Sequence, residues 1–200
     1  MSKFELHKYS RMRYEPNQII SFSDNTSFSA SDIDEKMKNY IGVSTVHVNE
    51  MKQQEFDYFI TNYGDNFESI YFFHNSKVKD LSALSKLKKV KYLLFYNFRS
   101  ESLWDMSKNE SLRGIMISDS KKMIYNLEQM QYAPNLEELL LFSTMFNKYC
   151  VKSITPLKKC KKLKRLFIEF NTEDKSFIPE EFNYLDEFKY QCDRKRNFTY

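Results

Sequence analysis

The stretch Leu136-Glu-Glu-Leu139-Leu-Leu141-Phe-Ser-Thr144 has apolar residues at its first, fourth and sixth positions and a small hydrogen-bonding residue at its ninth. The same pattern occurs at Phe67-Glu-Ser-Ile70-Tyr-Phe72-Phe-His-Asn75 and at Leu163-Lys-Arg-Leu166-Phe-Ile168-Glu-Phe-Asn171. Looser copies begin at Val43, Val90, Leu112 and Leu185, so that successive starts lie 22 to 27 residues apart. Such a period predicts stacked units that each contain one strand and a return segment.

This pattern resembles that of leucine-rich repeat proteins, and the shorter returns resemble the internalin-like bacterial subclass. The resemblance implies an α/β solenoid: a leucine-rich repeat right-handed superhelix of about seven repeats, with a concave parallel β-sheet and convex helices or 3₁₀ turns. It also implies two parts of the chain. Residues 1–41 would form an N-terminal cap and a degenerate first repeat, and residues 42–200 the repeats with a C-terminal capping strand.

The return segments differ along the chain. Ser31 followed by acidic residues predicts the start of a helix over residues 31–41, and the spacing of apolar residues predicts a second helix over 53–63. The returns at 78–87 and 154–160 are shorter and favour short helices or 3₁₀ turns. The longest spacing implies an inserted loop near Phe146 to Lys152. The last unit predicts a final strand within Tyr184–Cys192.

Two features of the pattern remain open in the sequence. Residues 1–16 carry spaced apolar residues before Pro16 and predict an edge strand or hairpin that caps the first unit. The ninth-position residues should turn inward and bond backbone groups of the adjacent unit, because buried unpaired groups are costly. Met51 and Phe98 occupy that position in two units, so either this polar ladder is broken there or the register shifts by one at Asn97.

Alternation along a strand places the third, fifth and seventh residues of each unit on the face opposite the core. In the middle units these residues are mainly aromatic or apolar, and this combination is typical of protein-binding surfaces. The predicted protein-binding residues are Tyr71, Phe73, Tyr92, Leu94, Tyr96, Met116, Glu138, Leu140, Phe142, Arg165 and Phe167. Alternatively, residues 1–30 or a second copy could cover this patch, or the face could simply be apolar.

Catalysis has little support in the sequence. The histidines His7, His47 and His74 share no short motif with a nucleophile or acid, and three glycines leave little room for a phosphate-binding loop. We therefore expect no enzyme activity, no cofactor and no metal. The number of cysteines, three, is odd, which argues against a disulfide framework. No apolar stretch has the length of a membrane span, and no leader of signal-peptide type opens the sequence. Together these features favour a cytoplasmic protein.

One basic run, residues 158–165, could meet phosphates together with Lys86, Lys88, Lys89 and Lys91, but a net charge of only +4 makes nucleic acid an unlikely partner. The sequence is best interpreted as a non-enzymatic recognition module for a protein partner, of the kind represented by immunity proteins that neutralise a bacterial toxin. A scaffold or regulatory subunit that docks on an enzyme is the alternative. Oligomeric state is left open.

Overall fold

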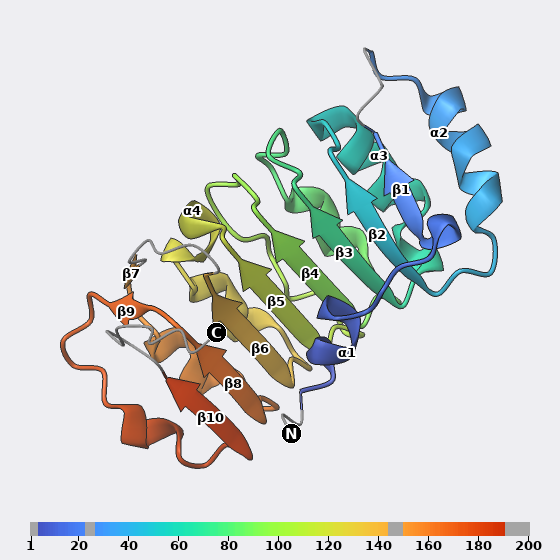
Figure 1. Cartoon of the computed structure of the whole chain (residues 1–200). Coiled ribbons are helices and arrows are strands. Elements are labelled where there is room, and N and C mark those ends of the chain that lie inside the picture. Colours follow the sequence, from blue (N-terminus) through green and yellow to red (C-terminus); the bar gives the residue numbers. More distant parts are fainter. Residues whose placement is uncertain (1–3, 23–26, 144–149, 191–200) are drawn as a thin grey trace, which may run out of the picture.

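The computed structural model describes residues 4–22, 27–143 and 150–190. It is an α/β fold with one large sheet, whose eight strands are all parallel and lie side by side in the order in which they occur in the chain (Figure 1). These strands are β1 (Ile19–Ser21), β2 (Thr45–Asn49), β3 (Ser69–Phe73), β4 (Tyr92–Tyr96), β5 (Gly114–Ser118), β6 (Glu138–Phe142), β8 (Arg165–Ile168) and β10 (Glu187–Tyr190).

The register predicted from the repeat pattern is confirmed at the seven strands of this sheet that follow β1. The third positions pair across the sheet in the order Thr45, Ser69, Tyr92, Gly114, Glu138, Arg165, Glu187. The sheet is open and not curled, so the concave surface predicted from the sequence is not what the structure shows (Figure 1). β1, which pairs with β2, is the expected extra strand before the first clear unit.

The returns lie on one side of the sheet and change in type along the chain. The first two are helices, α2 (Ala30–Met37) and α3 (Gln53–Asn62), followed by η2 (Lys38–Tyr40) and η3 (Gly64–Asn66). Ser29, not Ser31, caps α2: its backbone is extended and its hydroxyl accepts the amide of Asp32. Later returns are short, as predicted: η4 (Ser82–Lys86), α4 (Lys121–Tyr125), η5 (Glu128–Tyr132), η6 (Thr155–Lys159) and η7 (Pro179–Phe182).

The main core lies between the sheet and these returns. The fourth and sixth residues of the strands supply its sheet side, for example Ile70 and Phe72 of β3 and Leu139 and Leu141 of β6, all fully buried. This alternation follows from the two-residue period of a strand. The two-stranded pair β7 (Cys150–Val151) and β9 (Asn171–Thr172) lies outside the main sheet. β7 is part of the predicted insertion, of which residues 146–149 lie outside the described part.

The polar ladder at the ninth position is present but interrupted. The Asn75 side chain accepts the amide of Met51 at 2.7 Å and donates to the Val48 carbonyl at 2.9 Å. Ser120 Oγ accepts the amide of Phe98 at 2.8 Å. Each polar residue thus serves a neighbouring unit whose own ninth residue is apolar and buried in the core. The register does not shift at Asn97.

The eighth positions confirm this register independently. Glu50, His74, Asn97 and Asp119 all have φ between 52° and 59°, a left-handed conformation that is uncommon for residues other than glycine. The same sharp turn therefore ends β2, β3, β4 and β5 in succession. The expected polar residue at Thr144 lies outside the described residues.

The N-terminal segment is where the sequence prediction is wrong. Residues 4–14 form neither an edge strand nor a hairpin. They contain the short helix α1 (Leu6–Ser10), which lies across the sheet on the side away from the returns, near the amino ends of the strands (Figure 1). η1 (Pro16–Gln18) then leads into β1. The alternative in which this end of the chain folds back over the sheet is the one observed.

Candidate functional site

We refer to the side of the sheet crossed by residues 4–14 as the α1 face. Its centre is a small apolar cluster that is separate from the main core: Phe4, Leu6 and Tyr9 pack on Leu94, Met116 and Leu140. All six residues are at most 6% exposed. Three of the predicted protein-binding residues, Leu94, Met116 and Leu140, are therefore buried under the chain's own N-terminal segment and not open to solvent.

Gly114 shapes the point at which α1 approaches the sheet most closely. A Cβ at this position would lie 3.0 Å from Leu6 Cγ and 2.8 Å from Tyr92 Cδ1. A glycine inside a strand commonly marks a close approach of another segment. Gly114 therefore forms, with the buried residues around it, a socket for the Leu6 side chain. Here the term α1 socket means Leu94, Gly114, Met116, Glu138 and Leu140.

Glu138 supplies the polar contact of the socket. Its two carboxylate oxygens accept the amides of Glu5 and Leu6, both at 3.0 Å, at the start of α1. Arg165 Nε donates to the same carboxylate at 2.7 Å. Glu138 is only 1% exposed, and such a charge needs partners of this kind to be tolerated inside a protein. Glu138 and Arg165, both predicted as partner-binding residues, instead hold the chain's own first helix.

The N-terminal segment is held by few contacts. In the part of the chain that the structure describes, no backbone hydrogen bond joins α1 to a strand. Its attachment depends on the packing of Phe4, Leu6 and Tyr9 against the sheet and on the two backbone amides that donate to Glu138.

The remaining predicted residues form two partly exposed aromatic groups on either side of α1. Phe73 and Tyr96 stack with ring centroids 4.8 Å apart, and Tyr71 meets Phe73 edge to face. On the other side, Phe142 and Phe167 lie 6.3 Å apart. Tyr92 is also partly buried and packs against Tyr9 at 4.8 Å.

Three further rings join the first group. Tyr14 lies over His47 and Tyr71, His47 stacks on Tyr71 at 4.9 Å, and His74 meets the rings of Phe73 and Tyr96 edge to face. We call Tyr14, His47, Tyr71, Phe73, His74 and Tyr96 the aromatic cluster. Burial raises the pKa of Tyr71 to about 12 and lowers the pKa of His47 below 6.5, so both side chains are neutral near pH 7.

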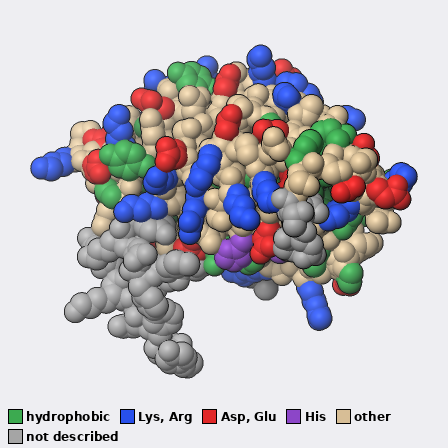
Figure 2. Space-filling model, turned by 90° about the horizontal axis from the view of Figure 1, so that it is seen from above, with side chains coloured by type: hydrophobic (Ala, Val, Ile, Leu, Met, Phe, Trp, Pro, Cys, Tyr) green, Lys and Arg blue, Asp and Glu red, His purple; other side chains and the backbone are tan. Residues whose placement is uncertain are grey.

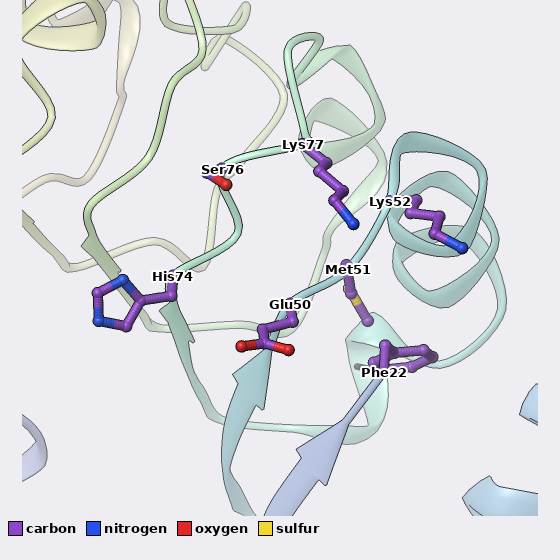
Figure 3. Close-up of a pocket in the computed structure, with 7 residues that line it drawn as sticks. All are labelled: Phe22, Glu50, Met51, Lys52, His74, Ser76 and Lys77. Atoms are coloured by element: carbon purple, nitrogen blue, oxygen red, sulfur yellow. The ribbon is translucent and has the colours of Figure 1, made fainter. Parts of the chain in front are cut away.

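A pocket of about 500 Å³ adjoins this cluster where β1, β2 and β3 end (Figure 3). Phe22 and Met51 form its apolar part, and Glu50, Lys52 and Lys77 contribute charges of both signs. In Figure 3 the Glu50 carboxylate lies between His74 and the two lysines, while the His74 ring points away from it. A pocket with this mixture of charges suits the polar rim of a protein interface.

The edge of the sheet at which the strands end has a mixed surface. Figure 2 shows acidic and basic side chains interspersed over it, with hydrophobic side chains in separate small groups. Part of the basic region expected from the sequence forms ion pairs: Lys158 with Glu181 and Lys164 with Glu137 in the run, and Lys91 with Glu68 in the earlier group. These ion pairs favour the interpretation of the run as solvated surface.

Within the described residues, no group of three or more His, Cys, Asp or Glu side chains could hold a metal ion, and no helix is long and apolar enough to cross a membrane. Burial raises the pKa of the Cys160 thiol to about 12, far from the thiolate that a nucleophile needs. No protein-family model matches the sequence, and no curated protein matches it either.

Sequence reasoning missed the residues that occupy the socket. Phe4, Leu6 and Tyr9 were recognised as spaced apolar residues, but nothing in their spacing indicated which surface they cover. The available signal was Gly114, one of only three glycines, at the third position of the unit that begins at Leu112 and among bulky neighbours.

Proposed function

We propose that this chain is a non-enzymatic recognition module that binds a protein partner through the aromatic cluster. The observation that carries the proposal is the stack of Phe73 and Tyr96, partly exposed at the carboxyl end of the sheet and surrounded by further rings. Aromatic residues held rigidly by their neighbours and bordered by charged groups dominate the binding energy of protein interfaces. The adjoining pocket provides such a border.

The proposal includes membership of the leucine-rich repeat class, supported by the repeat spacing and by the parallel register that it predicted correctly. The narrower expectations stay predictions: an internalin-like bacterial member, a cytoplasmic location, and a toxin domain neutralised by an immunity protein as the partner. So does the alternative of a scaffold or regulatory subunit docked on an enzyme. No observation favours one of these partners over the others.

Tyr96→Ala tests the proposal. We expect the variant to lose about 2 kcal/mol or more of partner affinity, roughly a thirty-fold rise in Kd, with little change in stability, because the ring lies at the surface. The partner would be captured by chemical crosslinking in cells that express the tagged chain, and its affinity then measured by calorimetry. Tyr132→Ala is the matched control, since Tyr132 is 53% exposed and lies on a return segment.

The measurement also separates the classes of partner. Binding through aromatic rings should survive an increase in salt, whereas binding to nucleic acid phosphates should weaken steeply. If Tyr96→Ala and Tyr132→Ala bind the partner with equal affinity, the proposed binding surface is refuted. If Tyr96→Ala unfolds the protein, the ring is part of the packed interior, and the proposed surface is equally wrong.

A further inference from the structure

We propose that the α1 socket is a binding site for a short helical segment of a partner protein, and that the chain's own N-terminal segment is an intramolecular competitor for it. The inference rests on the proposed function, because it gives the same face of the sheet a second, uncovered state. The contacts of α1 then describe the ligand: one helical turn with apolar side chains placed like Phe4, Leu6 and Tyr9.

The socket has the features of a site that recognises a helix. Glu138 presents both carboxylate oxygens to the first amides of α1, which are the groups that a helix leaves unpaired at its N-terminus. Arg165 fixes that carboxylate in place from the neighbouring strand. Gly114 provides the space for one branched aliphatic side chain, and the surrounding Leu94, Met116 and Leu140 bury it.

The covering segment fits less well beyond the socket. Three buried polar atoms on the strands next to it have no hydrogen-bond partner among the described residues: His47 Nε2, Asn49 Oδ1 and Ser69 Oγ. Buried polar groups are nearly always paired in native proteins. Tyr14, which lies over His47, leaves that ring nitrogen unsatisfied. A ligand that offers polar groups at these positions would therefore compete favourably with residues 4–14.

The linking residues allow the segment to leave. Arg11, Arg13 and Glu15 are exposed. The Tyr14 hydroxyl donates a hydrogen bond to the Tyr9 carbonyl at 3.0 Å, so this contact lies within the segment. The proposal requires residues 4–14 to leave as one unit, which also breaks the contacts of Tyr14 with His47 and Tyr71, while η1 and β1 remain on the sheet. Because the segment is tethered, it competes at a high effective concentration and a partner must bind more tightly than an untethered copy of it.

A synthetic peptide with the sequence of residues 4–14, labelled at its carboxyl end, serves as the probe. Leu6→Asp in the full chain removes the side chain that fills the socket, and circular dichroism verifies that this variant is folded. We expect Leu6→Asp to bind the peptide at least ten-fold more tightly than the wild type does. Adding Gly114→Ala, or Glu138→Gln if the alanine impairs folding, should reduce that affinity at least ten-fold.

A control variant separates this inference from the proposed function. Adding Tyr132→Ala to Leu6→Asp should leave peptide binding unchanged, because Tyr132 is exposed on a return segment and belongs to neither the socket nor the aromatic cluster. Loss of partner binding in Tyr96→Ala with intact peptide binding would support both ideas. If the peptide binds but Tyr96→Ala leaves partner binding unaffected, the socket is supported and the aromatic surface is refuted.

Hydrogen exchange in the wild-type chain provides the second test. The amides of Glu5 and Leu6 should exchange at least a hundred-fold faster than those of β4 and β5, because the segment opens without unfolding the sheet. Exchange at the same rate as the strands, or a peptide that does not bind Leu6→Asp, would overturn the inference. A wild-type dimer with exchanged N-terminal segments, detected by light scattering, would also overturn it by assigning the socket to a second copy.

Discussion

The two faces of the sheet are packed by very different amounts of chain. On one face a continuous core joins every strand to its return segment, from Ile20 at one end to Leu185 at the other. On the other face a single five-residue helix covers a small cluster. Leu140 and Leu141 are neighbours on β6, both fully buried, yet one belongs to each cluster. Equal burial therefore does not mean equal importance for the fold. The main core involves every strand of the sheet, whereas the buried cluster under α1 involves only β4, β5 and β6.

The largest expected effect uses this adjacent pair of leucines. Leu141→Ala should destabilise the protein by about 2–5 kcal/mol, because the surrounding core cannot collapse into the cavity. Leu140→Ala should cost about half as much or less, because α1 can shift or detach. Urea denaturation of both variants measures the difference. Equal losses would show that α1 is packed as firmly as the core.

Asn75→Ala should have the next largest effect, about 2–3 kcal/mol, because it removes the acceptor of the buried Met51 amide and a donor to the Val48 carbonyl. The matched control is Asn135→Ala, which removes a partly exposed side chain that donates to the Glu110 carbonyl and accepts from Lys162, and it should cost little. Urea denaturation again provides the measurement. A similar small loss in both variants would mean that the polar ladder contributes little to stability.

The contrast between the faces also explains what the sequence could predict. The main core comes from a pattern that recurs every 22 to 27 residues, so the sequence predicted the register and the facing of each strand correctly. The eighth-position turns repeat for the same reason. The placement of residues 4–14 depends on contacts between residues far apart in the chain, such as the hydrogen bond of the Leu6 amide to Glu138 across 132 residues, and no local pattern encodes them.

The candidate site was predictable only in part. Alternation assigned Phe73 and Tyr96 to the correct face, and they are partly exposed there. The same rule assigned Leu94, Met116 and Leu140 to that face, but it could not tell a free apolar surface from one covered by the chain itself. The curvature of the sheet, which was expected from the resemblance, depends on the shape of the returns. Strand alternation does not determine it.

Glu138→Gln should change the stability of the whole protein less than it changes the attachment of α1 to the sheet. The change keeps an acceptor oxygen for one amide of α1 but removes the charge that pairs with Arg165. We expect exchange of the Glu5 and Leu6 amides to accelerate about ten-fold while the urea midpoint changes less, because the main core contains no residue of α1. Glu137→Gln, on the same strand but in an exposed ion pair with Lys164, is the control. A large shift of the urea midpoint in Glu138→Gln alone would show that the cover is part of the cooperative core.

The smallest expected effect is a dependence of α1 attachment on pH. Burial lowers the pKa of His7 below 6.5, and Arg11 and Lys189 lower it further, while Glu138 and Glu187 oppose the shift. A detached segment would have the ordinary pKa and would therefore bind the proton more readily. Attachment should be fully favoured above pH 6.5 and weaken as the pH falls through that value towards the lowered pKa.

Amide exchange of residues 5–10, corrected for the intrinsic pH dependence of exchange, should therefore show opening that is about two- to five-fold more frequent at pH 5.5 than at pH 7.5. His7→Gln should remove most of this difference, because glutamine does not titrate in this range. Exchange of the β4 and β5 amides should not follow the same profile, since the main core contains no part of α1. Opening that becomes less frequent at low pH would mean that the opposing carboxylates dominate the environment of His7, and that protonation holds the cover down.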